Sequence, residues 1–120
     1  MSHYQTEIGY MIKVLKQPFK DYEEYSESKI YDELRGLGVY LNYDLTLSRV
    51  VIKESDDVLD GCIFPDNDVN YTKAITAFNQ VEKFNIELHG NLKPFVCSWY
   101  NGSDNPSDEI SLDRFNKLQG

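Results

Sequence analysis

The sequence is poor in cysteine and has no long apolar run. Its two thiols, Cys62 and Cys97, match neither a zinc ribbon nor a disulfide-rich secreted scaffold, which predicts buried free cysteines. No apolar stretch approaches the roughly 18 residues of a membrane span, and the N-terminal stretch lacks a cleavable signal pattern. We therefore expect a cytoplasmic protein with no membrane partner.

Basic residues are also scarce. The chain has 12 lysines and arginines against 20 aspartates and glutamates, a net charge of -8. This balance argues against a basic surface for the phosphates of DNA or RNA. No glycine-rich phosphate loop is present either, because Gly36 and Gly38 are better explained as a helix end. We expect no direct nucleic-acid partner and no cofactor.

The residues that are present predict a folded domain. The 120 residues are 41% hydrophobic and 13% aromatic, which is too apolar for intrinsic disorder. The nine tyrosines favour half-exposed surfaces and interfaces. No repeat, linker or low-complexity tract divides the chain, which predicts a single α+β domain over residues 1–120.

The first half of the chain contains one ambiguous pattern and two clearer ones. Residues 3–16 fit a helix ended by Pro18, although Ile8, Tyr10, Ile12 and Val14 also alternate as in a strand; we predict the helix. A second helix is expected over 26–37, with Gly38 as its left-handed cap. From Val39 the pattern has period two, with Tyr43 on the apolar side. It predicts a long strand or a hairpin that turns near 42–44 or at 48–49, with 50–52 continuing the sheet.

The second half predicts one firm helix and a hairpin. A short strand is expected at 62–64, and a helix over 70–84 that packs on the sheet. Segments 86–89 and 95–100 flank Gly90-Asn91, a pair suited to a tight hairpin turn, and Pro94 places the second arm at a sheet edge. A last short helix carries Leu112 and Phe115. The order α-α-β-β-β-α-β-β-α predicts an antiparallel or mixed sheet of about four to five strands, with three to four helices mainly on one face.

Carboxylates concentrate in two groups, for which two interpretations stay open. The first lies in ESDDVLDGCIFPDND and comprises Glu54, Asp56, Asp57, Asp60, Asp66 and Asp68; the second lies between Asp21 and Glu33 and includes Glu23, Glu24 and Glu27. Solvated loops and a helix N-terminus explain such acids without any partner. Alternatively, these nine residues form a partner-binding surface that attracts a basic protein.

Catalytic and metal sites have little support. Asp66, Asp68 and Asn70 imitate the start of a calcium-binding EF-hand loop, but Tyr71 and Ala77 occupy positions that need Gly and Glu. Cys97 and His89 are too few ligands for zinc and form a Cys-His pair only if the two hairpin arms bring them together. We predict no catalytic residue, no metal ligand and no enzyme activity.

The favoured hypothesis is a small acidic inhibitor that binds stoichiometrically to a basic, nucleic-acid-binding surface of a target protein. Toxin-immunity proteins and phage or mobile-element proteins directed against CRISPR or restriction systems, some of them nucleic-acid mimics, have this size and charge. The alternatives are a small enzyme or metal-binding protein that uses Cys/His or acidic-loop residues, and a homo-oligomeric phage accessory subunit.

Overall fold

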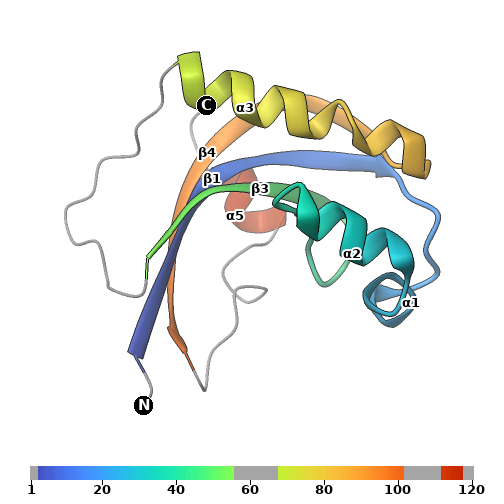
Figure 1. Cartoon of the computed structure of the whole chain (residues 1–120), viewed down its shortest axis with the longest axis horizontal. Coiled ribbons are helices and arrows are strands. Elements are labelled where there is room, and N and C mark those ends of the chain that lie inside the picture. Colours follow the sequence, from blue (N-terminus) through green and yellow to red (C-terminus); the bar gives the residue numbers. More distant parts are fainter. Residues whose placement is uncertain (1–2, 56–67, 102–111, 118–120) are drawn as a thin grey trace.

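The computed structural model is built on a strongly curved antiparallel sheet (Figure 1). It describes residues 3–55, 68–101 and 112–117. The elements in chain order are β1 (His3–Lys16), α1 (Tyr22–Ser26), α2 (Lys29–Gly36), β2 (Val39–Leu41), β3 (Leu47–Ser55), α3 (Asp68–Phe78), the 3-10 helix η1 (Val81–Phe84), β4 (Glu87–Asn101) and α5 (Leu112–Lys117).

Within these residues the sheet has four strands in the order β2-β3-β1-β4. Strand β1 is central and pairs antiparallel with β3 on one side and β4 on the other, so β4 and the short β2 form the edges. The predicted α+β class is confirmed: the chain forms a compact single α+β domain with an antiparallel sheet and helices mainly on one face.

Two apolar clusters lie on opposite faces of the sheet. The larger one joins the sheet to α1, α2, α3 and η1, and includes Tyr10, Ile12, Tyr25, Leu34, Val50, Phe78 and Val81. The smaller one joins the other face to α5, and comprises Met11, Leu47, Phe95 and Phe115. Helices α1 to α3 therefore cover one face, and α5 lies within the concavity of the other (Figure 1).

The predicted helix over residues 3–16 is wrong, because this segment is the central strand β1. A central strand that is covered on both faces buries consecutive side chains, here Tyr10 and Ile12 on one face and Met11 on the other. Apolar residues of both parities then imitate helical spacing. Gly9 is required by the neighbouring strand, since a Cβ at this position would lie 1.9 Å from the carbonyl oxygen of Val50.

The helix predicted over 26–37 is present as α2 but begins later, at Lys29, and a separate short helix, α1, ends at Ser26. Ser28 caps α2, with its hydroxyl oxygen accepting from the amide of Tyr31 at 3.2 Å, and so separates α2 from the shorter α1. The predicted left-handed conformation of Gly38 is confirmed by a φ of 74°. The helical stripe was correctly located, but its N-terminal boundary was not.

The first hairpin option is confirmed, and the turn lies over 42–46. The Asn42 side-chain oxygen accepts hydrogen bonds from the amides of Thr46 and Leu47 at 2.9 and 3.0 Å. This turn removes Tyr43 from the apolar side on which the alternation had placed it, and the residue is 68% exposed.

The predictions for the second half of the chain are partly confirmed and partly wrong. Helix α3 and η1 occupy most of the predicted helix over 70–84, and α5 confirms the last helix. The predicted hairpin at Gly90-Asn91 is wrong: β4 runs through both residues, and its register against β1 shifts there instead. Pro94 does lie in an edge strand, as predicted. The predicted strand at 62–64 falls outside the described residues.

In the described part of the chain, each helix is too short or too polar to traverse a bilayer.

Candidate partner-binding surface

The predicted acidic residues divide between two ends of the helical layer. Glu23 and Glu24 lie in α1, Glu27 follows as its C-cap, and all three are exposed. Exposed Asp68 begins α3, at the end of the layer away from α1 (Figure 1). Of the remaining predicted residues, Glu54 belongs to β3 without a described side chain, whereas Asp56, Asp57, Asp60 and Asp66 lie outside the described residues. Asp68 and the α1 carboxylates therefore do not form one surface.

Two of the carboxylates near α1 have a clear local task. Asp21 is the N-cap of α1, and its Oδ1 atom accepts a hydrogen bond from the Glu24 amide at 2.9 Å. Glu24 in turn accepts from the Lys20 amide at 3.4 Å. The two side chains act much as a capping box does, so folding alone explains their presence.

Glu23 lies in the first turn of α1, where the helix dipole favours negative charge, but neither Glu23 nor Glu27 has a side-chain capping role such as that of Asp21. They are four residues apart, a spacing at which like charges on a helix repel each other. Glu27 lies at the C-terminal end of α1, where the helix dipole disfavours negative charge, although the N-terminus of α2 follows directly. Neither carboxylate takes part in an ion pair among the residues that the structure describes. Their charge is thus open to a partner.

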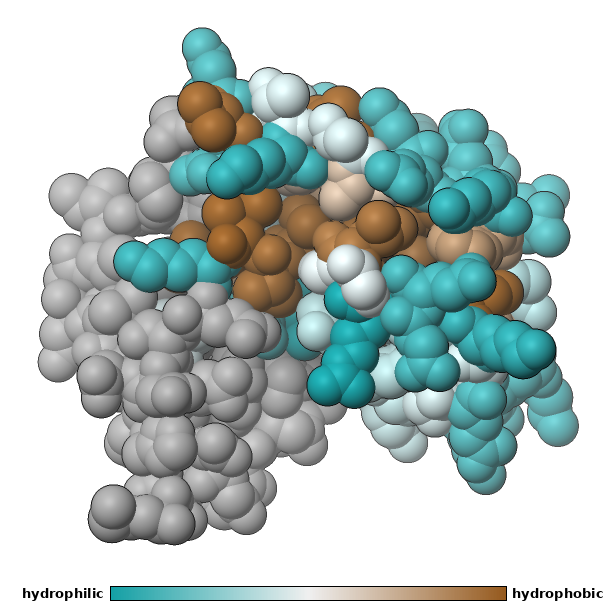
Figure 2. All heavy atoms as spheres, viewed as in Figure 1, coloured by the Kyte–Doolittle hydropathy of each residue, from teal (hydrophilic) through white to brown (hydrophobic). Residues whose placement is uncertain are grey.

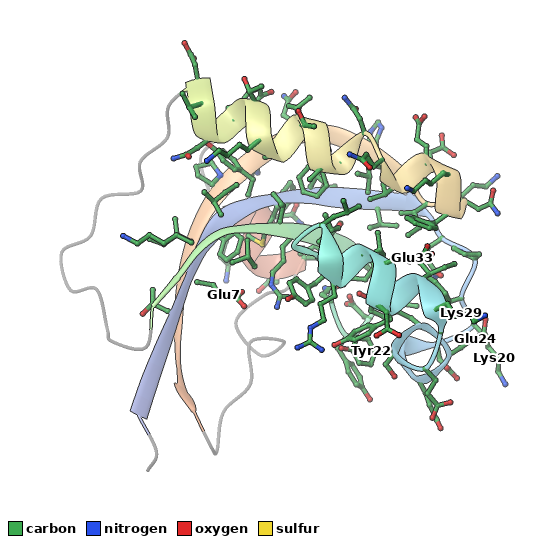
Figure 3. All side chains as sticks on the ribbon, in the orientation of Figure 1. Glu7, Lys20, Tyr22, Glu24, Lys29 and Glu33 are labelled. Carbon is green, nitrogen blue, oxygen red and sulfur yellow. The ribbon has the colours of Figure 1, made fainter. Side chains whose placement is uncertain are left out.

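A hollow of about 580 Å³ lies between α1 and the β2–β3 turn. Its lining residues are Gln17, Lys20, Asp21, Tyr22, Glu23, Ser26, Tyr43, Asp44 and Leu45. Figure 3 shows Tyr22, Glu24 and Lys20 together at this end of the molecule. In Figure 2 the outer surface of this end is hydrophilic, whereas an apolar stripe follows the seam between α2 and α3.

Two tyrosines, Tyr22 and Tyr43, line the hollow. The ring centroids of Tyr22 and Tyr43 lie 5.4 Å apart, and the two ring planes are tilted by 31°. The Tyr25 ring makes an edge contact with Tyr22, with 5.5 Å between the ring centroids, and its hydroxyl oxygen accepts a hydrogen bond from the Leu41 amide at 3.0 Å. Burial is the main cause that raises the pKa of Tyr25 to about 12, and burial also raises the pKa of Tyr22. Both phenols are therefore neutral at physiological pH.

We call this region the acidic tyrosine surface; it comprises five residues that line the hollow, Asp21, Tyr22, Glu23, Tyr43 and Asp44, together with the exposed Glu27 at the C-terminal end of α1. Sequence reasoning found the carboxylates of α1 but missed both tyrosines as site residues. The signal for Tyr43 was its place between Asn42 and Asp44, two residues that favour turns. An aromatic residue inside a polar turn is expected to be exposed, because a turn lies on the surface.

A second arrangement of a tyrosine and a carboxylate lies on the sheet face that α5 partly covers. Arg49 donates to Glu7 through Nε at 3.0 Å and Nη2 at 3.5 Å. Its guanidinium carbon lies 4.6 Å from the ring centroid of Tyr40, which is its partner across the β2–β3 ladder. Arg49 is 8% exposed and Glu7 is 5% exposed, so the ion pair is buried.

Two specific arrangements considered for catalysis and metal binding, the Cys-His pair and the EF-hand frame, differ from what the structure shows. His89 and Cys97 pair with Lys13 and Glu7 of β1, which puts them roughly 20 Å apart along one strand, so the supposed Cys-His pair does not form. The EF-hand frame is helical from Asp68 onward, where a calcium loop is needed. Among the described residues, no three His, Cys, Asp or Glu side chains are grouped to hold a metal ion.

The fold and this surface define a small α+β domain that carries an open, acidic and tyrosine-lined hollow at one end. In comparisons with known proteins, no family model, curated protein or solved structure matches the chain. Function is accordingly argued from the site, because a fold class alone does not imply an activity.

Proposed function

We propose that this protein binds a basic surface of a partner protein through the acidic tyrosine surface. The observation that carries the proposal is that Tyr43, which is 68% exposed, lines the hollow with Asp21, Glu23 and Asp44, carboxylates that make no ion pair with any other described residue. Tyrosine is enriched in interfaces because its ring buries a large area at low entropic cost and its hydroxyl finds polar partners. The carboxylates around it add attraction for positive charge and speed the encounter.

We further propose that binding inhibits the partner stoichiometrically. A basic surface that fits Glu23, Glu27 and Asp44 is of the kind that proteins use for nucleic-acid phosphates. Carboxylates that occupy it exclude the nucleic acid. The net charge of -8 and the small size support such a role, of the type found in toxin-immunity and anti-defence proteins. The protein itself then needs no catalytic residue.

The first experiment is an affinity capture of the tagged protein from nuclease-treated lysate of its host or target cell. We expect one partner at stoichiometric yield that is released as the salt concentration rises, because screening weakens interactions between exposed charges. Addition of the protein to that partner should then inhibit its activity at a one-to-one ratio. Capture of no partner at any salt concentration contradicts the proposal.

Charge reversal tests the surface directly. The double variant Glu23→Lys with Glu27→Lys should lower the association rate by about tenfold or more at low salt, since steering depends on the sign of the charge. The matched control is Glu82→Lys with Glu87→Lys, which changes the same charge at exposed positions that line another hollow. If both doubles slow association equally, only net charge matters and the surface is wrong.

Asp68→Lys distinguishes the two acidic groups. It lies at the opposite end of the helical layer from α1 (Figure 1). We expect little change in association beyond that of the control double. A loss larger than that of the α1 double moves the binding surface to the group around Asp68.

A further inference from the structure

We propose that the hollow between α1 and the β2–β3 turn binds the side chain of one arginine of the partner. The guanidinium stacks on the exposed face of Tyr43, and its N–H groups donate to the carboxylates at the rim. This inference depends on the proposed function, because it names the group by which the partner is held.

The protein already contains such an arrangement in filled form. Arg49 lies against the ring of Tyr40, with 4.6 Å between the guanidinium carbon and the ring centroid, and donates two hydrogen bonds to Glu7. A planar guanidinium can stack on a ring and bind a carboxylate along its edge at the same time. The buried example shows that a tyrosine and a carboxylate in this fold accommodate arginine.

The hollow offers the same two groups without the guanidinium. The Tyr22 ring lies 5.4 Å from the Tyr43 ring, and Tyr43 remains 68% exposed, so a ligand in the hollow can reach it. Within the described residues, Asp21 and Asp44 accept hydrogen bonds from Glu24 and Thr46 through Oδ1, so their Oδ2 atoms can accept from a ligand. The volume of about 580 Å³ is ample for one side chain.

Arginine fits this hollow better than lysine does. A guanidinium is planar, weakly hydrated and able to donate to two carboxylates, whereas an ammonium is strongly hydrated and makes no stack. Lys20 is the one basic residue among those that line the hollow. It makes no ion pair within the described residues and lowers the attraction for a second cation.

The probe is acetyl-arginine amide, titrated into the full-length protein and followed by amide chemical shifts. We expect shifts confined to residues 20–26 and 43–45, saturating at millimolar concentrations. Nα-acetyl-citrulline amide, the neutral isostere, should cause no comparable shifts. Nα-acetyl-lysine amide, which keeps its charged ammonium group, should bind several-fold more weakly. Equal shifts with citrulline, or shifts elsewhere only, overturn the inference.

Variants identify the contacts. Tyr43→Ala should weaken arginine binding by about two- to fivefold, the range of an exposed cation–π contact, whereas Tyr43→Phe should retain it. Tyr71→Ala, the same change at a 44% exposed tyrosine of α3, is the matched control. Lys20→Gln should increase the affinity, because it removes the competing cation. An unchanged affinity in Tyr43→Ala contradicts the proposed stack.

The two proposals fail in different ways. If Glu23→Lys with Glu27→Lys weakens the captured complex but Tyr43→Ala does not, and arginine amide causes no local shifts, the acidic surface stands and the arginine site falls. If arginine amide binds at the hollow but no protein is captured, the arginine site stands and the partner-inhibitor proposal falls.

Discussion

Two regions of the described residues combine tyrosine and carboxylate groups: in one an arginine is ion-paired with the carboxylate, and in the other the one basic residue lining the hollow, Lys20, makes no ion pair within the described residues. Glu7, Arg49 and Tyr40 lie on neighbouring strands; Tyr40 pairs directly with Arg49, whose side chain reaches Glu7 on the next strand, and the ion pair is buried. Asp21, Tyr43 and Asp44 lie at a helix start and in a turn, where their side chains remain at the surface. Figure 3 shows this separation through Glu7 and Tyr22. The position in the fold therefore decides whether the same chemistry serves the core or faces outward.

The largest expected effect on stability comes from removing Arg49 from its buried ion pair with Glu7. Arg49→Ala leaves the Glu7 carboxylate buried without its partner, which should lower the free energy of unfolding by about 3–5 kcal/mol. Urea denaturation followed by circular dichroism measures the change. Arg35→Ala, at an exposed position of α2, is the control and should change the stability by less than about 0.5 kcal/mol. If both variants lose a similar amount of unfolding free energy, the buried ion pair does not contribute to stability more than an exposed arginine does.

The next largest effect concerns Tyr25, whose ring contacts Tyr22 of the acidic tyrosine surface. Its pKa is raised from 10.0 to about 12 in the folded protein, so the folded state holds this proton more strongly than the unfolded chain does. The stabilisation is complete below about pH 10 and is lost as the pH rises through 12, by roughly 2–3 kcal/mol.

Tyr25→Phe is the control for this pH dependence, because phenylalanine has no proton to lose. The variant should be less stable at neutral pH, since the Leu41 amide loses its acceptor. The stability difference between the natural protein and Tyr25→Phe should then narrow between pH 10 and 12, as measured by urea denaturation. A constant difference would show that Tyr25 titrates as an ordinary tyrosine.

The smallest effect on stability is expected at Tyr43 of the acidic tyrosine surface. Tyr43→Ala should change the free energy of unfolding by no more than about 0.5 kcal/mol, because an exposed ring contributes little burial. Tyr40→Ala should cost more, since that ring covers the Arg49 guanidinium. Thermal denaturation of the two variants compares them. A large loss in Tyr43→Ala would indicate that the Tyr22–Tyr43 stack serves folding and would weaken the case for a binding role.

Sequence reasoning succeeded where local chemistry dominates. The turn after β2, the left-handed Gly38 and the short α5 follow from residue preferences over a few positions. It failed for β1 and β4. A strand covered on both faces has no clean alternation, and Gly90-Asn91 proved to mark a register shift rather than a reversal of the chain.

The candidate surface was predictable only in part. Glu23, Glu24 and Glu27 were recognised as a negative cluster because charge is visible in composition. The position at which α1 begins decides the separate roles of two of them. Glu24 takes part in the capping of α1, whereas Glu23 lines the hollow. Tyr43 was assigned to the apolar side of a strand, because alternation does not show where a strand ends and its turn starts.

The sequence by itself determined the negative charge, the α+β class and the tyrosine-rich composition, since these are sums over residues or patterns over short windows. Tertiary structure decided which charges are neutralised and which remain available. Glu7 and Arg49 are 42 residues apart in the chain, and only the β1–β3 pairing brings them together. Asp21 and Tyr43 likewise meet at one hollow only after α1 has packed beside the β2–β3 turn. Contacts of this kind depend on long-range burial, which no local window of sequence contains.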